Sequence, residues 1–343
     1  MTLQVNTLYV TTEGAWVHKE QDTVVVSVNK ERRAQVPMIH LAAVACFGRV
    51  MMSPDLMAAL LEAGIHVAFF SATGRFLARV EGMPGGSVVL RRLQHRAADS
   101  ADKSLALARS FVIGKIANGR QFVLHARRDA PSQERKDRLD GAAEQMALLL
   151  RQAAAVDTID SLRGVEGGAA KEYFGIFKDL VKRSEEAFEF RSRSRHPPRD
   201  RINALLSFGY ALLMHDCSAA LVGVGLDPAI GFLHEDRPGR LSLALDLMEE
   251  LRAPIVDRLV ISLINRGQIA ADDLSEDAAG AWRLTDPARK QFLVVYQEVK
   301  QATIQHAFLE QDAPWGRVAH LQALLLARTL RGDLDAYPPF SVR

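Results

Sequence analysis

The sequence predicts an α+β protein in which a small N-terminal β-rich domain precedes a larger all-α domain. Apolar and β-branched residues form short runs over the first ~80 residues, as they do in strands. From about Leu90 onward, apolar residues recur with the period of amphipathic helices. Pro84-Gly85-Gly86 lies between the two regions, and such a stretch is unfavourable inside a regular element. We therefore expect domains at 1–83 and 96–343, joined by a linker at 84–95.

In the N-terminal region, we expect strands at 3–10, 23–28, 33–38, 67–70 and 76–80. One helix is expected between them. Ser53 followed by Pro54 is typical of a helix start, and Gly64 is typical of a helix end. Leu56, Leu60 and Leu61 provide the apolar stripe of this helix.

In the second region, we expect helices around 105–116 and 146–150, and over 203–224, 242–251, 255–266 and 290–308. The longest apolar run, 204–214, ends at His215 and Asp216 and is too short to cross a bilayer. We expect a buried helix there and no membrane association.

The composition narrows the functional classes. The protein has 343 residues, of which 48% are hydrophobic and 24% charged, so global disorder is excluded. A net charge of +2 means that a polyanion would have to be held by a local basic patch. Neither Cys46 nor Cys217 belongs to a CxxC pair, which argues against a disulfide framework and a cysteine zinc site. This usage, with no secretory signal at the N-terminus, fits a reducing cytoplasm.

Acidic residues follow a histidine in the segment 231–250. If Ser242 caps a helix, Asp246 and Glu249 lie three residues apart on one face, and His234 precedes them by one short turn-containing stretch. Such a mixed oxygen and nitrogen site suits Mg²⁺ or Mn²⁺. The alternative is an ordinary solvated helix face with a surface histidine. Periodicity does not choose Glu249 over Glu250, although Glu250 would point about 100° further round the helix.

Glu166 lies in a stretch of small residues, Gly164 to Ala170. Small neighbours allow a ligand or another backbone to approach a carboxylate closely, as metal coordination requires. The alternative is a helix start, with Glu166 in the first turn, where the helix dipole favours an acid.

An arginine-rich segment follows at 191–201. Arginine suits phosphate oxygens, and Pro197-Pro198 keeps the segment extended so that it can follow a nucleic-acid backbone. The alternative is a solvated charged face. The candidate DNA-binding residues are Arg191, Arg193, Arg195 and Arg199.

Together these segments resemble the CRISPR-associated spacer-acquisition integrase, a metal-dependent Cas nuclease. The resemblance covers most of the chain. It is strongest in EGGAA at 166–170 with YF at 173–174, HPPRD at 196–200, NALLSFGY at 203–210, and 225–234 followed by 242–250. Arg201-Ile202 stands where a proline commonly follows the aspartate, and Glu249 stands where some members have aspartate.

The resemblance implies a catalytic α-helical domain at 96–343 with Mg²⁺ or Mn²⁺ held by Glu166, His234 and Glu249, and with Asp246 as a further catalytic acid. The implied reaction inserts short protospacer DNA into a CRISPR repeat by attack of a 3′-hydroxyl. It also implies a homodimer formed through the β-rich domain at 1–83 and a small ferredoxin-like Cas partner that bridges two dimers. The alternatives are a metal-dependent nuclease without integration activity and a non-catalytic DNA-binding scaffold.

Overall fold

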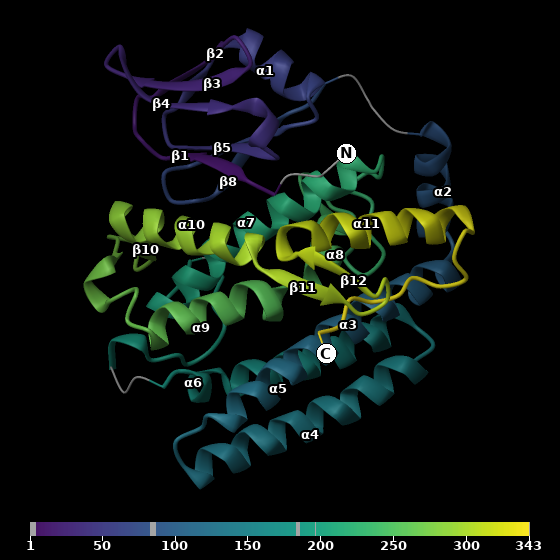
Figure 1. Ribbon diagram of the computed structural model, residues 1–343. Coiled ribbons are helices and arrows are strands. Elements are labelled where there is room, and N and C mark those ends of the chain that lie inside the picture. The colour runs from purple at the N-terminus through teal and green to yellow at the C-terminus, as the bar shows by residue number, and fades with distance from the viewer. Residues whose placement is uncertain (1–4, 83–86, 183–185, 196, 343) are drawn as a thin grey trace. The chain divides into compact units, whose positions relative to one another are not determined.

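The computed structural model describes residues 5–82, 87–182, 186–195 and 197–342 (Figure 1). The chain divides into two compact units. The first comprises Met1–Gly85, Arg289–Thr303 and Pro314–Arg317, and the second comprises Gly86–Ala288, Ile304–Ala313 and Val318–Arg343. The Pro-Gly-Gly stretch of the expected linker lies outside the described residues, and residues 88–95 belong to helix α2 (Val88–Ala98). The boundary at 84–95 stays a prediction.

Two four-stranded sheets make up the strand-rich unit within the described residues. One has the order β1-β5-β7-β8, in which β5 runs parallel to both β1 and β7. The other has the order β4-β3-β2-β6. The strands are β1 (Thr7–Val10), β2 (Trp16–Glu20), β3 (Thr23–Val28), β4 (Glu31–Pro37), β5 (Ala43–Phe47), β6 (Met51–Met52), β7 (His66–Phe70) and β8 (Phe76–Val80).

Helix α1 (Pro54–Glu62) joins β6 to β7 and begins as the sequence predicts. Ser53 Oγ accepts a hydrogen bond from Leu56 N–H at 3.3 Å, and Gly64 follows the helix with φ of 71°. Leu56 and Leu60 are fully buried in the core of this unit, whereas Leu61 is only partly buried.

The predicted strands at 23–28 and 76–80 are confirmed with the same bounds as β3 and β8. The strands β2, β5 and β6 were not predicted. All five residues of β5 are buried, and such a strand shows no alternation of apolar and polar residues. Three of its residues are alanine or cysteine, which carry little strand preference.

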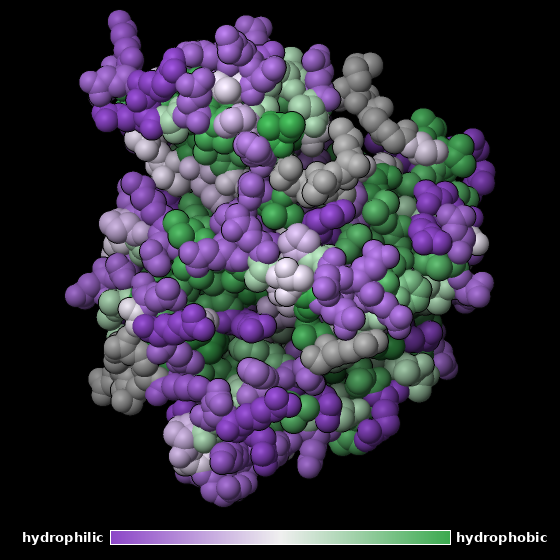
Figure 2. Space-filling view, in the orientation of Figure 1, coloured by the Kyte–Doolittle hydropathy of each residue, from purple (hydrophilic) through white to green (hydrophobic). Residues whose placement is uncertain are grey.

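The second unit is mostly helical, as predicted. Its principal helices are α2, α3 (Ala101–Arg128), α4 (Gln133–Ala155), α5 (Ile159–Gly175), α6 (Phe177–Leu180), α7 (Arg201–Gly223), α8 (Ser242–Glu249), α9 (Arg258–Asn265) and most of α11 (Trp315–Arg331). Short 3-10 turns lie at η2 (Glu186–Phe188) and η4 (Ala271–Asp273), and another, η1 (Met38–His40), lies in the strand-rich unit. Helix α3 packs along both α4 and α5 (Figure 1). Hydrophilic side chains predominate over α4 in the lower part of Figure 2.

Two short hairpins interrupt the helical pattern, so the second region is not purely α. Strand β9 (Leu274–Glu276) pairs with β10 (Trp282–Leu284), and β11 (Thr303–His306) pairs with β12 (Gln311–Pro314). The helix expected over 290–308 is α10 (Asp286–Gln301), which ends before β11. The β-branched pair Thr303-Ile304 follows the end of that helix, and such residues favour strands.

Helix α7 contributes many buried side chains to the core of the second unit. It is long and apolar enough to cross a membrane by length and composition, but 67% of its most apolar window is buried inside the protein. Its apolar residues therefore form core, as the sequence predicts. Between α8 and α9 the chain forms a π-helical segment, η3 (Arg252–Asp257). A turn of π-helix is wider than a turn of α-helix, so Arg252 and Asp257, five residues apart, lie closer to one face than they would in an α-helix.

Candidate active site

The four predicted catalytic residues all belong to the helical unit. Glu166 lies in the middle of α5, Asp246 and Glu249 lie on α8, and His234 lies within the irregular stretch before α8. Glu166 is therefore not in the first turn of its helix, and that alternative is wrong. The alternative of a solvated α8 face is also wrong, because Asp246, Glu249 and Glu250 are all buried.

Asp246 organises the loop that carries His234. Its Oδ2 accepts hydrogen bonds from the N–H groups of Phe232 and Leu233 at 2.6 and 3.0 Å, and its Oδ1 accepts from His234 N–H at 3.0 Å. Oδ1 also lies 2.6 Å from His234 Nδ1. A carboxylate on Nδ1 fixes the imidazole orientation and leaves Nε2 available as a ligand. Asp246 is fully buried and acts on the site through His234.

The loop can approach α8 this closely because residue 231 is a glycine. A Cβ atom on Gly231 would lie 2.7 Å from Ser242 Cβ and 3.0 Å from Asp246 Oδ2. Ser242 is the first residue of α8 rather than its cap, which is Leu241, and the serine hydroxyl donates to the carbonyl of Glu235 at 2.9 Å. The expected serine cap is therefore wrong, although the helix begins where predicted.

Arg163 connects α5 to the same loop. Its Nε and Nη2 both donate to the carbonyl of Leu233, at 3.1 and 2.9 Å, and its Nη1 lies 3.1 Å from Glu235 Oε1. Arg163 precedes Glu166 by one helical turn, so it ties the helix of one candidate ligand to the loop of another.

Glu166 and Glu249 converge on one cation, the ammonium group of Lys115 on α3. Lys115 Nζ bonds Glu166 Oε1 and lies 2.7 Å from Glu249 Oε2. Arg252 Nη2 lies 3.1 Å from Glu249 Oε1, and His234 Nε2 lies 3.9 Å from the same oxygen. Burial alone would raise the pKa of Glu249, but Arg252 and Lys115 lower it well below its ordinary value.

Glu250 contacts other partners than Glu249 does, and its pKa shifts in the opposite direction. It is fully buried, and its Oε2 accepts from Phe340 N–H at 2.8 Å and from Gln322 Nε2 at 2.9 Å. Burial raises the pKa of Glu250 to about 8. Its Cγ packs against α3, where a Cβ on Gly114 would lie only 2.9 Å away. The fold thus assigns Glu249 to the polar cluster and Glu250 to the core.

The cluster contains the donor types that a hard divalent cation prefers. Two carboxylate oxygens from different helices reach the same ammonium group, so one cation can contact both. The imidazole of His234 stands beside them. Among the described residues, however, no group of three or more His, Cys, Asp or Glu side chains is already gathered as a metal site. Lys115 lies at the point where the two glutamates meet.

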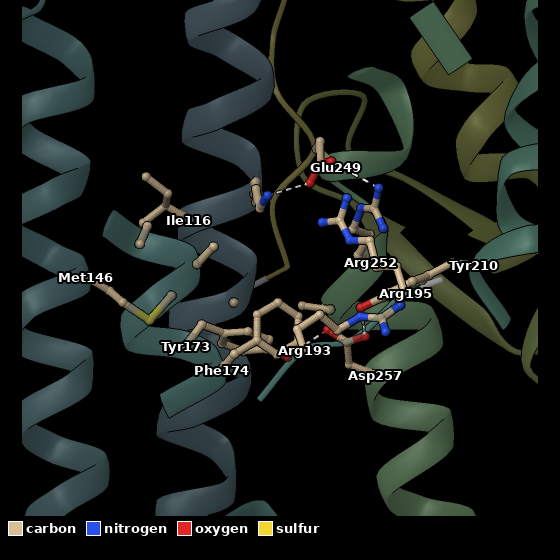
Figure 3. Close-up of a pocket in the computed structure, with 15 residues that line it drawn as sticks. Ile116, Met146, Tyr173, Phe174, Arg193, Arg195, Tyr210, Glu249, Arg252 and Asp257 are labelled. Atoms are coloured by element: carbon tan, nitrogen blue, oxygen red, sulfur yellow. Dashed lines mark hydrogen bonds and ion pairs between the residues drawn. The ribbon is translucent and has the colours of Figure 1, made fainter. Parts of the chain in front are cut away.

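A pocket adjoins this cluster and extends toward η3 (Figure 3). Asp257 accepts hydrogen bonds there from the hydroxyls of Tyr173 and Tyr210, at 2.8 and 2.5 Å. Burial raises the pKa of Asp257 to about 6. The guanidinium carbon of Arg252 lies 4.6 Å from the centre of the Tyr210 ring. Arg193, Arg195 and Arg252 gather beside Asp257 in Figure 3, so the pocket joins a cationic side to an apolar one.

The predicted DNA-binding arginines differ in their surroundings. Arg191, Arg195 and Arg199 are exposed, and Arg191 pairs with Glu189 at 3.0 Å. Arg193 is partly buried and donates to Asn203 Oδ1 at 2.6 Å and to Ser207 Oγ at 3.2 Å. Arg193 thus fastens its segment to α7, while the other three have side chains at the surface. His196 of the HPPRD motif lies outside the described residues.

Sequence reasoning did not place Lys115, Arg163, Arg252 or Asp257 beside the predicted metal ligands. One feature of the sequence could have indicated Lys115, because it is a lone cation among apolar helix residues between Phe111 and Ile116. No spacing relates it to the two glutamates, because they lie on other helices.

Residues 8–298 match the family model described as CRISPR associated protein Cas1. The chain is 45% identical over 340 residues to CRISPR-associated endonuclease Cas1 1 of Chlorobaculum tepidum, and the match covers 99% of each chain. It is 48% identical over 341 residues to CRISPR-associated endonuclease Cas1 2 of Rhodospirillum rubrum, with 98% of each chain covered.

Solved structures show the same fold. A CAS1 protein from Thermotoga maritima matches with a TM-score of 0.81 at 24% identity, covering 98% of this chain and 100% of that one. A casposase bound to integration product gives a TM-score of 0.83 at 22% identity, covering 97% and 93%. A chain of a Cas6-RT-Cas1–Cas2 complex gives 0.81 at 25% identity, covering 99% of this chain and 36% of that chain.

The family model covers most of the chain, and the two endonuclease relatives align over nearly their whole length. The α+β fold agrees with that of a solved member. The protein belongs to the Cas1 family of CRISPR-associated endonucleases.

Proposed function

We propose that this protein inserts short protospacer DNA into a CRISPR array, using Mg²⁺ or Mn²⁺ held by Glu166, His234 and Glu249. The observation that carries the proposal is the convergence of Glu166 and Glu249 on one cation beside His234, although the three residues come from distant parts of the chain. When bound, the ion supplies Lewis-acid stabilisation to charge on the phosphoryl oxygens.

The other residues position these ligands and the DNA. Asp246 holds the imidazole of His234 so that Nε2 faces Glu249, and Arg163 holds the His234 loop against α5. Three exposed arginines are proposed to contact DNA phosphates, namely Arg191, Arg195 and Arg199. Of these, Arg195 also lines the adjoining pocket. Arg193 is proposed to contribute mainly by holding that segment in place, since it already has internal partners.

We also propose that the protein acts in the cytoplasm as a homodimer formed through its strand-rich unit, with a small ferredoxin-like Cas partner bridging two dimers. Trp16 and Met51 are exposed neighbours on the paired strands β2 and β6, and Ile39 and Leu77 of the same unit are also exposed. Exposed apolar side chains of this kind favour association. A solved structure with the same fold belongs to a Cas1–Cas2 complex, which supports the partner.

The test is a strand-transfer assay with a labelled protospacer that carries a free 3′-hydroxyl and a plasmid that contains a CRISPR repeat. Glu166→Gln, His234→Ala and Glu249→Gln should each abolish joining while DNA binding persists, because the proposed phosphate contacts are separate residues. Glu144→Gln is the matched control, because Glu144 is exposed on α4 of the same unit.

Three outcomes are informative. Joining by the three ligand variants would place the active site elsewhere. DNA cleavage without joining by the wild-type protein, in the presence of its Cas partner, would indicate a nuclease that lacks integration activity. Metal-independent DNA binding with neither reaction would indicate a scaffold.

A further inference from the structure

Lys115 is the group on which the two candidate glutamate ligands meet. Its ammonium bonds Glu166 on one helix and lies 2.7 Å from Glu249 on another. The Lys115 side chain is only 19% exposed and that of Glu249 only 4%, so water screens this cluster weakly. The ammonium group of Lys115 is therefore held between two carboxylates in a weakly screened site.

The partners of the two glutamates define what a divalent ion meets on arrival. Arg252 contacts Glu249 Oε1, whereas Lys115 contacts the other oxygen, Oε2, and also Glu166. Asp246 is engaged with backbone N–H groups and His234. Lys115 is thus the cation shared by both carboxylates, while Arg252 contacts only one of them.

A divalent ion that used these two oxygens would need the position that the ammonium occupies. Like charges at contact distance repel strongly in a weakly screened site, so the ammonium and the ion exclude each other. Lys115 also lines the pocket beside the cluster, and its flexible four-carbon side chain gives the ammonium a place to move.

We propose that Lys115 is a built-in competitor of the metal ion, which pairs with Glu166 and Glu249 in the metal-free protein and leaves them when the ion binds. This inference rests on the proposed metal site. It gives Lys115 two effects. The lysine holds the ligand helices together before the ion arrives, and it weakens the affinity for the ion because each binding event must displace an ammonium.

The first experiment measures Mn²⁺ binding by isothermal titration calorimetry in the absence of DNA. Lys115→Met keeps the length of the side chain and removes its charge, so Mn²⁺ affinity should rise by about tenfold or more, as expected from one charge-assisted hydrogen bond removed from competition. Lys115→Arg restores a cation and should return the affinity toward that of the wild-type protein. An unchanged or weaker affinity in Lys115→Met would overturn the inference.

Glu166→Gln and Glu249→Gln separate this inference from the proposed function. Both should weaken Mn²⁺ binding, which is the opposite direction from Lys115→Met. If neither glutamine variant changes the affinity, the proposed metal site itself is wrong. If they weaken it and Lys115→Met does not raise it, only the role of Lys115 is wrong.

A second experiment needs no substitution and remains decisive if Lys115→Met does not fold. Amine-specific labelling of the wild-type protein, followed by mass spectrometry, reports the accessibility of each lysine. Addition of Mg²⁺ should increase labelling of Lys115 several-fold and leave the exposed Lys171 on α5 unchanged. Equal or reduced labelling of Lys115 at saturating Mg²⁺ would contradict the displacement.

Discussion

Glu250 offers a test of how the core supports the active site. Replacing Glu250 with alanine removes the acceptor for two buried donors, Phe340 N–H and the Tyr337 hydroxyl, whereas Gln322 keeps other acceptors in Tyr337 and Pro338. A buried donor left unpaired costs about 1–3 kcal/mol, and the lost methylene about 0.8 kcal/mol. We expect the alanine variant to lose about 3–7 kcal/mol of unfolding free energy. Its melting temperature should fall by on the order of 10 °C.

Glu250→Gln is the matched variant, since it keeps the methylene groups and one oxygen acceptor and should lose less than half as much stability. Urea denaturation followed by circular dichroism measures both changes. Equal stability of Glu250→Ala and the wild-type protein would refute the reasoning, and so would equal losses in the two variants. The sequence alone suggests that Glu250→Ala is a harmless control, but its complete burial makes an exposed glutamate such as Glu144 the better choice.

Further predictions concern DNA binding, pH and assembly. Glutamine in place of the exposed Arg191, Arg195 and Arg199 should reduce the slope of log affinity against log salt concentration. The expected reduction is about 0.9 per lost phosphate contact on duplex DNA. An unchanged slope would make these residues a solvated face. The pKa of Asp257, raised to about 6, means that the native state keeps this proton where the unfolded chain loses it. The protonated Asp257 carboxyl therefore contributes fully to stability below pH ~4, and this contribution is lost as the pH rises through ~6. The unfolding free energy changes by about 3 kcal/mol over that range. Asp257→Asn should lack this loss when unfolding free energies are compared between pH 4 and 7. If the variant and the wild-type protein showed the same dependence of unfolding free energy on pH, the raised pKa of Asp257 would be contradicted. Met51→Glu should shift the protein toward monomer in light scattering, whereas a dimer of unchanged stability would show that β6 is not at the interface.

The change of period near residue 90 was enough to predict the order of a β-rich region and a helical one. Cap residues also predicted α1 correctly, because Ser53 and Pro54 act through local hydrogen bonding and backbone geometry. The assignment of Arg289–Thr303 to the strand-rich unit was not predictable in this way. It depends on long-range contacts such as the bond from Thr7 N–H to Gln297 Oε1 at 3.2 Å, which leave no local pattern.

The candidate site shows the same contrast between what local sequence patterns predict and what long-range contacts decide. Residue type and motif order predicted Glu166, His234 and Glu249 as metal ligands, but periodicity alone did not choose Glu249 over Glu250. That choice depends on Lys115 and Arg252 on one side and on the Phe340 segment on the other, all brought in by tertiary packing. Opposite pKa shifts in adjacent glutamates are a property of these surroundings and not of the helix that carries them.

The π-helical segment η3 makes the site sensitive to the backbone geometry of a single turn. Arg252 and Asp257 lie close to one face because a π-helical turn holds more residues than an α-helical turn does. If the same six residues relaxed into an α-helix, in which each position advances by 100°, Arg252 and Asp257 would lie about 140° apart around the helix axis. The cation that contacts Glu249 and the acid that joins the two tyrosines would then diverge around the axis, with every side chain still present. The wide backbone turn of this segment, and not only the identity of its residues, therefore determines which groups lie together at the site.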